Sequence, residues 1–167
     1  MSVKVSVYIG LGSNLDDPLA QIQTAVATLN QTEELKVLAC SSLYGSKPQG
    51  PQDQPDFANA VCLVETTLSP LNLLACLQAI EQQQGRVKKR HWGERLIDLD
   101  ILLYGAQVIS TEVLTVPHAE IANRDFVLIP LVEIAPDLVI PNFGSIGSLI
   151  SKLDVSYLKP LAESHAV

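Results

Sequence analysis

The chain has 167 residues, of which 47% are hydrophobic, and this excludes a disordered protein and predicts one domain, residues 1–167, with a buried core. Its formal net charge of −7 excludes the broad basic surface that nucleic-acid and membrane-surface binders need. No apolar run is long enough to span a bilayer or to form a secretory signal, so we expect a cytoplasmic protein.

The cysteines support the same expectation. Cys40, Cys62 and Cys76 are an odd number without CxxC spacing, and each lies in an apolar run. This pattern predicts buried free thiols, which suit a reducing compartment.

Apolar patterns in the first part of the chain predict strands and helices in the order β-α-β-β-α-β. In chain order these elements are Val3–Ile9, a helix from Pro18 capped by Asp17, Lys36–Leu43, Ala58–Glu65, a helix from Ser69 to Gly85, and Leu96–Tyr104. A loop rich in Gly, Pro and Gln separates the two middle strands, and loops of this length are usually functional.

This order is typical of an α+β, ferredoxin-like fold, in which both helices pack on one face of a four-stranded antiparallel sheet. The other face is left for loops to cover, and a substrate could lie there. From about Tyr104 the chain forms a C-terminal extension. We expect a short helix over Arg124–Glu133, kinked or split at Pro130, and a last helix over Ser145–Leu153.

Basic residues are concentrated in one window of the chain. Five of the 11 Lys and Arg residues lie within residues 86–95, and they are Arg86, Lys88, Lys89, Arg90 and Arg95. Trp92, the only tryptophan, lies among them and offers a flat apolar face for a ring. Because such a cluster suits phosphate oxygens and is too small for a duplex, it favours a nucleotide ligand.

Two aspartates follow this window at once. Asp98 and Asp100 lie in a predicted strand, where side chains two residues apart share a face and lie roughly 6–7 Å apart. Like charges this close repel each other unless a cation lies between them, and magnesium bridged by ATP phosphates would fit. The alternative is a half-buried strand with a solvated acidic face, and the adjacent basic window favours the metal site.

Other polar and aromatic residues are candidates for binding a ring. Asn59 lies on an otherwise apolar strand, where its amide needs either backbone partners or a ring with alternating donors and acceptors. Phe57 shares its face and could stack on such a ring, and Phe126 could do the same. His118 follows Pro117 in an apolar turn, where a hydrogen bond to phosphate and a structural role both fit.

The segment Gly10-Leu11-Gly12 follows a strand, as a dinucleotide-binding fingerprint does. Its third glycine is missing and the element order does not build a parallel sheet, so we reject that interpretation. Tight-turn glycines that pack close to neighbouring backbone explain the segment better. An ordinary γ-phosphoryl kinase is also disfavoured, because the sequence has no P-loop and no kinase signature.

Five segments make the chain resemble the 6-hydroxymethyl-7,8-dihydropterin pyrophosphokinase family of folate biosynthesis. They are YIGLGSN (8–14), GPQDQPDFANAV (50–61), IEQQQGR (80–86), RHWGERLIDLDILLYG (90–105) and LTVPHAEIANRDFVLIPLVEIAP (114–136), and they cover nearly the whole length. The resemblance implies a ferredoxin-like fold and transfer of the terminal pyrophosphate of ATP to the pterin's hydroxymethyl group, with release of AMP. It implies ATP and the hydroxymethyl pterin as partners, and we expect a monomer.

The resemblance also implies roles for single residues. Asp98 and Asp100 match the ligands of two magnesium ions, and Arg86 and Arg95 match the catalytic arginines that engage the phosphates. The residues that match pterin-binding positions are Ser46, Pro48, Phe57, Asn59, Trp92 and Phe126. The residues that match ATP-binding positions are Gln78, Glu81, Lys88, Trp92, Ile101, Thr115, His118 and Arg124.

No side chain stands out as a general base, so positioning and electrostatics would supply most of the acceleration. The competing hypothesis is a non-catalytic ferredoxin-like sensor of small molecules. A sensor does not need a metal pair beside an arginine-bearing loop, and this feature separates the two hypotheses.

Overall fold

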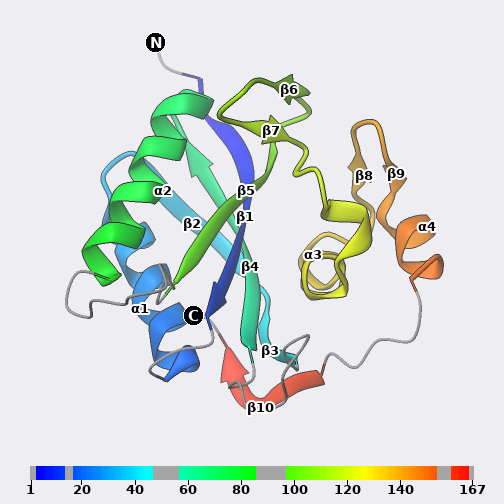
Figure 1. The fold of residues 1–167 in the computed structure, drawn as a ribbon, viewed down its shortest axis with the longest axis horizontal. Helices are drawn as coiled ribbons and strands as arrows, with labels where there is room; N and C mark the ends of the chain where they lie inside the picture. The colour runs from blue at the N-terminus through cyan, green and yellow to red at the C-terminus, as the bar shows by residue number, and fades with distance from the viewer. Residues whose placement is uncertain (1–2, 14–16, 47–56, 86–96, 154–158, 166–167) are drawn as a thin grey trace.

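The computed structural model describes residues 3–13, 17–46, 57–85, 97–153 and 159–165. Within these ranges a six-stranded antiparallel sheet forms the centre, and four α-helices pack around it (Figure 1). The expected α+β class with an antiparallel sheet is therefore confirmed.

The strands of the sheet lie in the order β10-β3-β4-β1-β5, and β2 also pairs with β4. Their bounds are Val5–Ser13 (β1), Leu35–Cys40 (β2), Ser42–Ser46 (β3), Phe57–Thr66 (β4), Asp98–Tyr104 (β5) and Lys159–His165 (β10). Strand β10 was not predicted, because the sequence of residues 159–165 lacks the apolar alternation of a strand. It pairs with β3 and so covers an edge that would otherwise be open.

The single strand predicted over Lys36–Leu43 is in fact two strands, β2 and β3. Ser41 separates them, and its hydroxyl accepts a hydrogen bond from the Val61 N–H (2.9 Å) and donates one to the Ser42 carbonyl (2.8 Å). The Ser41 N–H also donates to the Val61 carbonyl (2.8 Å). These bonds hold both strands on β4 although the strand is interrupted.

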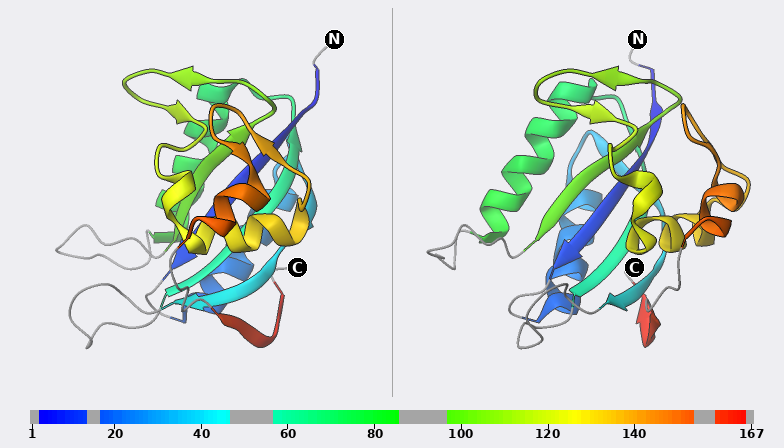
Figure 2. Two further views of the ribbon diagram at one scale, coloured as in Figure 1. Left: turned by 90° about the vertical axis from the view of Figure 1, so that its right-hand side faces the viewer. Right: turned by 45° about the vertical axis from the view of Figure 1, so that its right-hand side comes forward.

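Two amphipathic helices, α1 (Pro18–Gln31) and α2 (Pro70–Gly85), cover one face of the sheet (Figures 1 and 2). Asp17 caps α1 as predicted, since its side chain accepts a hydrogen bond from the Ala20 N–H (3.4 Å). The main core lies between these helices and the sheet, and it includes Ile22, Leu29, Leu73, Leu77, Ile80, Val7, Ile9, Leu11, Leu99 and Ile101. Burial of each of these large side chains stabilises the fold by roughly 1.5–3 kcal/mol.

Loops were expected to cover the opposite face of the sheet, but helices cover part of it as well. Helices α3 (Asp125–Ile134) and α4 (Ile146–Ser151) and a 3₁₀ turn (Ile121–Asn123) cover part of it (Figure 2). They form a second core with residues of the sheet, which include Val61, Leu102 and Leu103. The physical reason lies in β5, whose residues after Asp100 are apolar on both faces and so need cover on both.

Pro130 lies inside α3 and does not split it. Proline removes only its own N–H from the helical ladder, and the rest of the helix continues to Ile134. Two short hairpins complete the extension: β6 (Ile109–Ser110) with β7 (Thr115–Val116), and β8 (Val139–Ile140) with β9 (Gly144–Ser145). Across the ranges described above, no helix has the length and apolar character needed to cross a bilayer.

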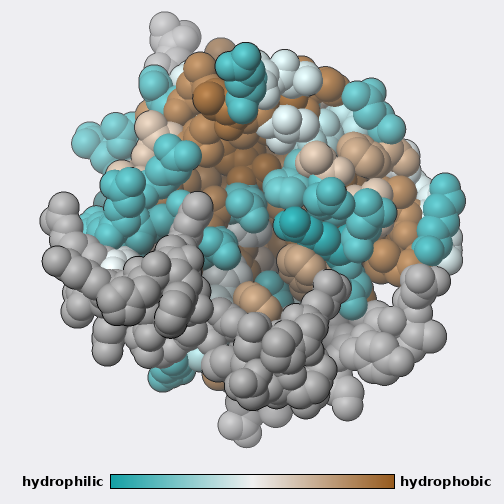
Figure 3. Space-filling view, viewed as in Figure 1, coloured by the Kyte–Doolittle hydropathy of each residue, from teal (hydrophilic) through white to brown (hydrophobic). Residues whose placement is uncertain are grey.

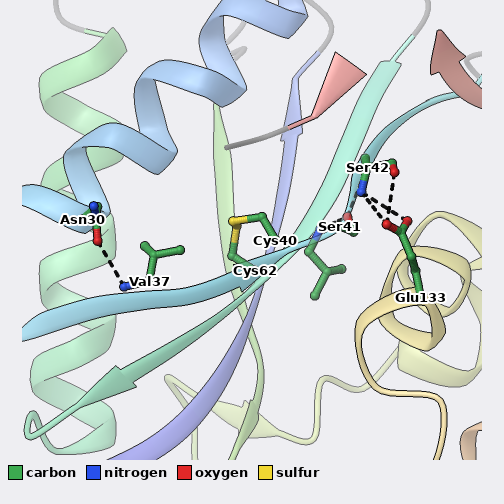
Figure 4. Close-up of a disulfide and its surroundings, with 8 residues drawn as sticks. Asn30, Val37, Cys40, Ser41, Ser42, Cys62 and Glu133 are labelled. Atoms are coloured by element: carbon green, nitrogen blue, oxygen red, sulfur yellow. Dashed lines mark hydrogen bonds between the residues drawn. A yellow bond between two sulfur atoms is a disulfide. The ribbon is translucent and has the colours of Figure 1, made fainter. Parts of the chain in front are cut away.

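Cys40 and Cys62 form a disulfide between β2 and β4 (Figure 4), so the prediction of free thiols is wrong for this pair. The two residues face each other in the strand register, with Cα atoms 4.1 Å apart, although they are 22 residues apart in sequence. Cys76 is a free, half-buried thiol, and its pKa is raised by burial and then by the charge of Glu34. The cysteines therefore do not indicate a reducing compartment.

Candidate active site

The strand β5 presents both predicted acids on one face of the sheet. Asp98 and Asp100 are exposed, whereas Leu99 and Ile101 between and after them are each 4% exposed and belong to the main core. The predicted alternation is therefore confirmed. Because the main core lies under α1 and α2, the two carboxylates point to the opposite face, on which α3 packs.

The strand register brings Asn59 into line with these acids. In β1, Gly12 pairs with Asn59 of β4 on one side and with Asp98 of β5 on the other. Gly10 pairs with Asp100 in the same way. Directly opposite residues of antiparallel strands project to the same face, and adjacent strands lie about 4.8 Å apart. Asn59 and Asp98 thus lie about 10 Å apart across one row, with a glycine between them.

Gly12 has no side chain, so nothing projects from β1 between Asn59 and Asp98. A Cβ atom at this position would lie 3.1 Å from Oδ1 of Asn59, closer than most real contacts, so only glycine leaves the amide undisturbed. Since β1 continues to Ser13, both Gly10 and Gly12 lie within a strand. The interpretation as tight-turn glycines is therefore wrong, and the close contact at Gly12 is with the side chain of Asn59 rather than with neighbouring backbone.

Residues predicted to bind a ring lie at the β4 end of the row formed by Asn59, Gly12 and Asp98. Asn59 is 5% exposed, and Phe57 lies two residues before it on the same face of β4. The backbone of Ser46 in β3 pairs with Phe57, and Tyr44 pairs with Asn59. Phe126, in the first turn of α3, and Arg124 lie together, with the guanidinium 5.5 Å from the ring centroid.

His118 follows β7 and lies within electrostatic range of Asp100 and Arg124. The backbone N–H of His118 donates a hydrogen bond to the Leu102 carbonyl (3.0 Å), which holds this residue against β5. Its Nδ1 accepts a hydrogen bond from the Glu120 N–H (3.1 Å), so the neutral ring carries its proton on Nε2 and can donate it to an anion. Burial lowers the pKa of His118, Arg124 lowers it further, and Asp100 and Glu120 oppose the change.

Several of the predicted ATP residues that the structure describes lie beside the edge of β5 that faces away from β1. Glu81 of α2 accepts a hydrogen bond from the Leu99 N–H (2.7 Å), and Gln78 is one helical turn before it and exposed. Thr115 in β7 is exposed near β5. The side chain of Ile101 is buried in the main core and cannot face a ligand here. The Leu99 N–H points away from β1, toward Glu81. Residues two apart in a strand direct their backbone groups to the same side, so the backbone N–H and carbonyl of Ile101 also point away from β1.

The remaining predicted residues, Pro48, Arg86, Lys88, Trp92 and Arg95, lie outside the described residues. In the part of the chain that is described, no group of three or more His, Cys, Asp or Glu side chains could hold a metal ion. Asp98 and Asp100 are both exposed and lie two residues apart on one face of β5. Figure 3 shows the side of the molecule that faces the viewer in Figure 1. Hydrophilic surface gathers near its centre, between the parts formed by α2 and α3.

Glu133 was not among the site residues predicted from the sequence. It lies in the last turn of α3, and its carboxylate accepts hydrogen bonds from the Ser42 N–H (3.0 and 3.1 Å), the Ser42 hydroxyl (3.0 Å) and the Tyr44 hydroxyl (2.6 Å). The available signal was its position as the only charged residue in 126–136, an otherwise apolar segment.

Stability should fall between pH 10 and about pH 12 because of Tyr44. The pKa of its hydroxyl is raised from 10.0 to about 12, by burial and then by the hydrogen bond and charge of Glu133. Above pH 10 the unfolded chain loses this proton while the folded chain keeps it. The stabilisation is therefore complete below pH 10 and is lost as the pH rises through about 12. Melting temperatures should fall less steeply over this range in Tyr44→Phe than in the unmodified chain, and parallel curves would contradict the assignment.

Comparison with known proteins gives consistent matches. Residues 8–136 match the family model described as 7,8-dihydro-6-hydroxymethylpterin-pyrophosphokinase (HPPK). A 2-amino-4-hydroxy-6-hydroxymethyldihydropteridine pyrophosphokinase of Haemophilus influenzae is 53% identical over 148 residues, which cover 89% of this chain and 92% of the relative. The Pseudomonas aeruginosa protein with the same name is 48% identical over 145 residues, covering 87% and 90%.

A solved structure supports the fold. The chain is similar to the crystal structure of Plasmodium falciparum HPPK-DHPS, wild type with pteroate, with a TM-score of 0.71 and 16% identity. The match covers 91% of this chain and 43% of that one. At this identity the likeness speaks for the fold alone.

Proposed function

Because the chain belongs to the 7,8-dihydro-6-hydroxymethylpterin-pyrophosphokinase family, we propose that it transfers pyrophosphate from ATP to the hydroxymethyl group of 6-hydroxymethyl-7,8-dihydropterin, in folate biosynthesis. The observation that carries the proposal is the row Asn59–Gly12–Asp98 across three strands. One end of this row has an amide suited to a pterin edge, and the other has a carboxylate suited to a metal with phosphates.

In the proposed reaction, the pterin hydroxyl oxygen attacks the β-phosphorus of ATP. A bond forms between this oxygen and the β-phosphorus, and the bond from the β-phosphorus to the oxygen bridging it to the α-phosphorus breaks. The bridging oxygen leaves with AMP, and the hydroxyl proton goes to solvent. The products are the pterin diphosphate and AMP, and no described side chain is assigned as the base.

The donor set of Asp98 and Asp100 fits magnesium. Magnesium in nucleotide sites takes one or two protein carboxylates and completes its octahedron with phosphate oxygens and water. Two exposed carboxylates on one face, without a third ligand among the described residues, match that requirement. We assign two magnesium ions to this pair, and when bound with ATP they would neutralise phosphate charge.

The remaining residues would bind and align the two substrates. Nε2 of His118 and the guanidinium of Arg124 can donate hydrogen bonds to phosphate oxygens beside Asp100. The residues proposed along the edge of β5 for the rest of ATP are Gln78, Glu81, Thr115 and the backbone of Ile101. The residues proposed around the pterin ring are Ser46, Pro48, Phe57, Asn59, Trp92 and Phe126. From the basic window, Arg86, Lys88 and Arg95 are proposed for the phosphates of ATP.

The fold is also consistent with this assignment. We assign β1-α1-β2/β3-β4-α2-β5 to a ferredoxin-like unit, with β2 and β3 together taking the place of one strand. The observed order β5-β1-β4-β3, with α1 and α2 on one face, supports this assignment.

The nucleotide product tests the proposed function. Incubation with ATP, magnesium and the hydroxymethyl pterin should give AMP and the pterin diphosphate in equal amounts, because the β-phosphorus is attacked. Ion-exchange chromatography separates AMP from ADP. Stoichiometric ADP with a pterin monophosphate would contradict the assignment, and no turnover at all would favour the sensor hypothesis.

Gly12→Ala should raise the KM for the pterin more than the KM for ATP. The added Cβ would press on Oδ1 of Asn59, and displacing one hydrogen-bonding group costs about 1 kcal/mol, or about five-fold in affinity. Gly10→Ala is the matched control, since its Cβ would lie 3.4 Å from the Leu102 side chain, an ordinary contact. Steady-state kinetics at saturating ATP measures the KM for the pterin in both variants. An equal rise in Gly12→Ala and Gly10→Ala would show that a side chain at Gly12 does not specifically disturb Asn59.

A further inference from the structure

Glu133 joins two elements that are far apart in the sequence. It projects from the end of α3 toward the start of β3, and Figure 4 shows its carboxylate directed at Ser42. Three donors converge on it: the N–H and hydroxyl of Ser42 and the hydroxyl of Tyr44. Bonds of this kind to a charged acceptor are about twice as strong as bonds between neutral groups.

Of the two joined elements, α3 carries one of the residues proposed for the pterin, and β3 pairs with β4, which carries two others. Tyr44 pairs with Asn59, and the next alternate residue of β3, Ser46, pairs with Phe57. The other end of α3 carries Phe126 in its first turn. Holding α3 to β3 therefore fixes the place of Phe126 relative to Asn59 and Phe57.

The carboxylate is suited to this task in a way that an amide is not. Both of its oxygens accept hydrogen bonds, and the Tyr44 phenol, whose ordinary pKa is 10.0, is protonated and a donor at neutral pH. A glutamine has one acceptor oxygen and no charge, so one hydroxyl, of Ser42 or Tyr44, would have to turn and accept from its NH₂ group. The remaining hydrogen bonds would then join neutral groups and be weaker.

We propose that Glu133 is a positioning residue for pterin recognition, which acts by fixing α3 on β3 and so setting the width of the pterin site. This inference rests on the proposed function. It differs from a purely structural role in its kinetic signature: the pterin affinity changes selectively, whereas general destabilisation affects both substrates or neither.

Glu133→Gln tests the inference. We expect its KM for the hydroxymethyl pterin to rise about five-fold, as the weakening of hydrogen bonds to an exposed carboxylate allows, while the KM for ATP stays nearly unchanged. Glu65→Gln is the matched control, because Glu65 lies on β4 and forms an ion pair at the surface with Lys4 (3.6 Å). This control should leave both KM values unchanged.

A second variant keeps the test decisive if Glu133→Gln does not fold. Tyr44→Phe removes one donor and keeps the ring, so it should also raise the pterin KM selectively, by a smaller factor. A lower melting temperature with both KM values unchanged, or equal rises in both, would overturn the positioning role. Absence of AMP formation in the unmodified chain would instead refute the proposed function, so the two failures are distinguishable.

Discussion

Replacing either Asp98 or Asp100 by asparagine is expected to lower turnover by at least about 100-fold while the fold stays intact. Even changes outside the first ligand shell of metal sites cost about 10–100-fold in metal affinity or activity. Both residues are exposed on β5, so the amide keeps the shape and disturbs no core. Removing one of two neighbouring like charges should leave the melting temperature in metal-free buffer equal or higher.

Asp137→Asn is the control for this experiment, since Asp137 is an exposed aspartate that lies outside the proposed site. It should keep full activity at every magnesium concentration. Turnover of the Asp98 and Asp100 variants should be measured across a magnesium titration together with thermal unfolding. Near-native activity of both variants at ordinary magnesium would show that this pair does not hold the metal.

Asn59→Leu is expected to weaken pterin binding and to spare ATP binding. The polar edge of the pterin would then face a hydrocarbon side chain and lose its partners, which costs roughly 1–3 kcal/mol, or about 5- to 150-fold in affinity. The residue is 5% exposed and lies in a row with Gly12 and Asp98, so the loss is confined to one end of the site. Isothermal calorimetry with each ligand separately measures the difference.

Thr66→Val is the matched control for Asn59→Leu. Thr66 is also a buried polar residue of β4, 1% exposed, and its hydroxyl donates to the Glu34 carbonyl (2.9 Å) and accepts from the Leu68 N–H (3.0 Å). Its loss should lower the melting temperature without favouring one ligand. If Asn59→Leu lost affinity for both ligands equally, the effect would be a disturbed fold and Asn59 would not be the pterin reader.

Features that depend on local periodicity could be predicted from the sequence. Asp98 and Asp100 alternate with Leu99 and Ile101, and a period of two places them on one face whatever the rest of the chain does. The same holds for the apolar stripes of α1 and α2, and for the cap at Asp17, whose side chain bonds to a residue three positions later.

Features that depend on strand register could not be predicted. Gly12 faces Asn59 and Asp98 only because β1 pairs with β4 and β5 in one particular register, which tertiary packing sets. For the same reason the sequence could not reveal that Cys40 faces Cys62. A shift of one residue in either pairing would have turned these side chains to opposite faces.

The extension was the least predictable part. The role of Glu133 depends on α3 packing across β3, and its hydrogen-bond partner Ser42 lies 91 residues away in the sequence. Ile101 shows the converse case, because a family match placed it at the ATP site while its strand parity buries the side chain in the core. The position of a residue in the alternation of a strand sets the face to which its side chain projects. It therefore decides whether the side chain or only the backbone can reach a ligand.

A structure of the ternary complex would show where the metal, the phosphates and the pterin bind. Crystals grown with the hydroxymethyl pterin, a non-hydrolysable ATP analogue and manganese in place of magnesium would locate the metal by its anomalous signal. We expect two metal peaks beside Asp98 and Asp100, the phosphates next to His118, and the pterin ring over Gly12 with its polar edge at Asn59. Metal peaks away from these aspartates, or a pterin bound on the α1 and α2 side of the sheet, would contradict the account.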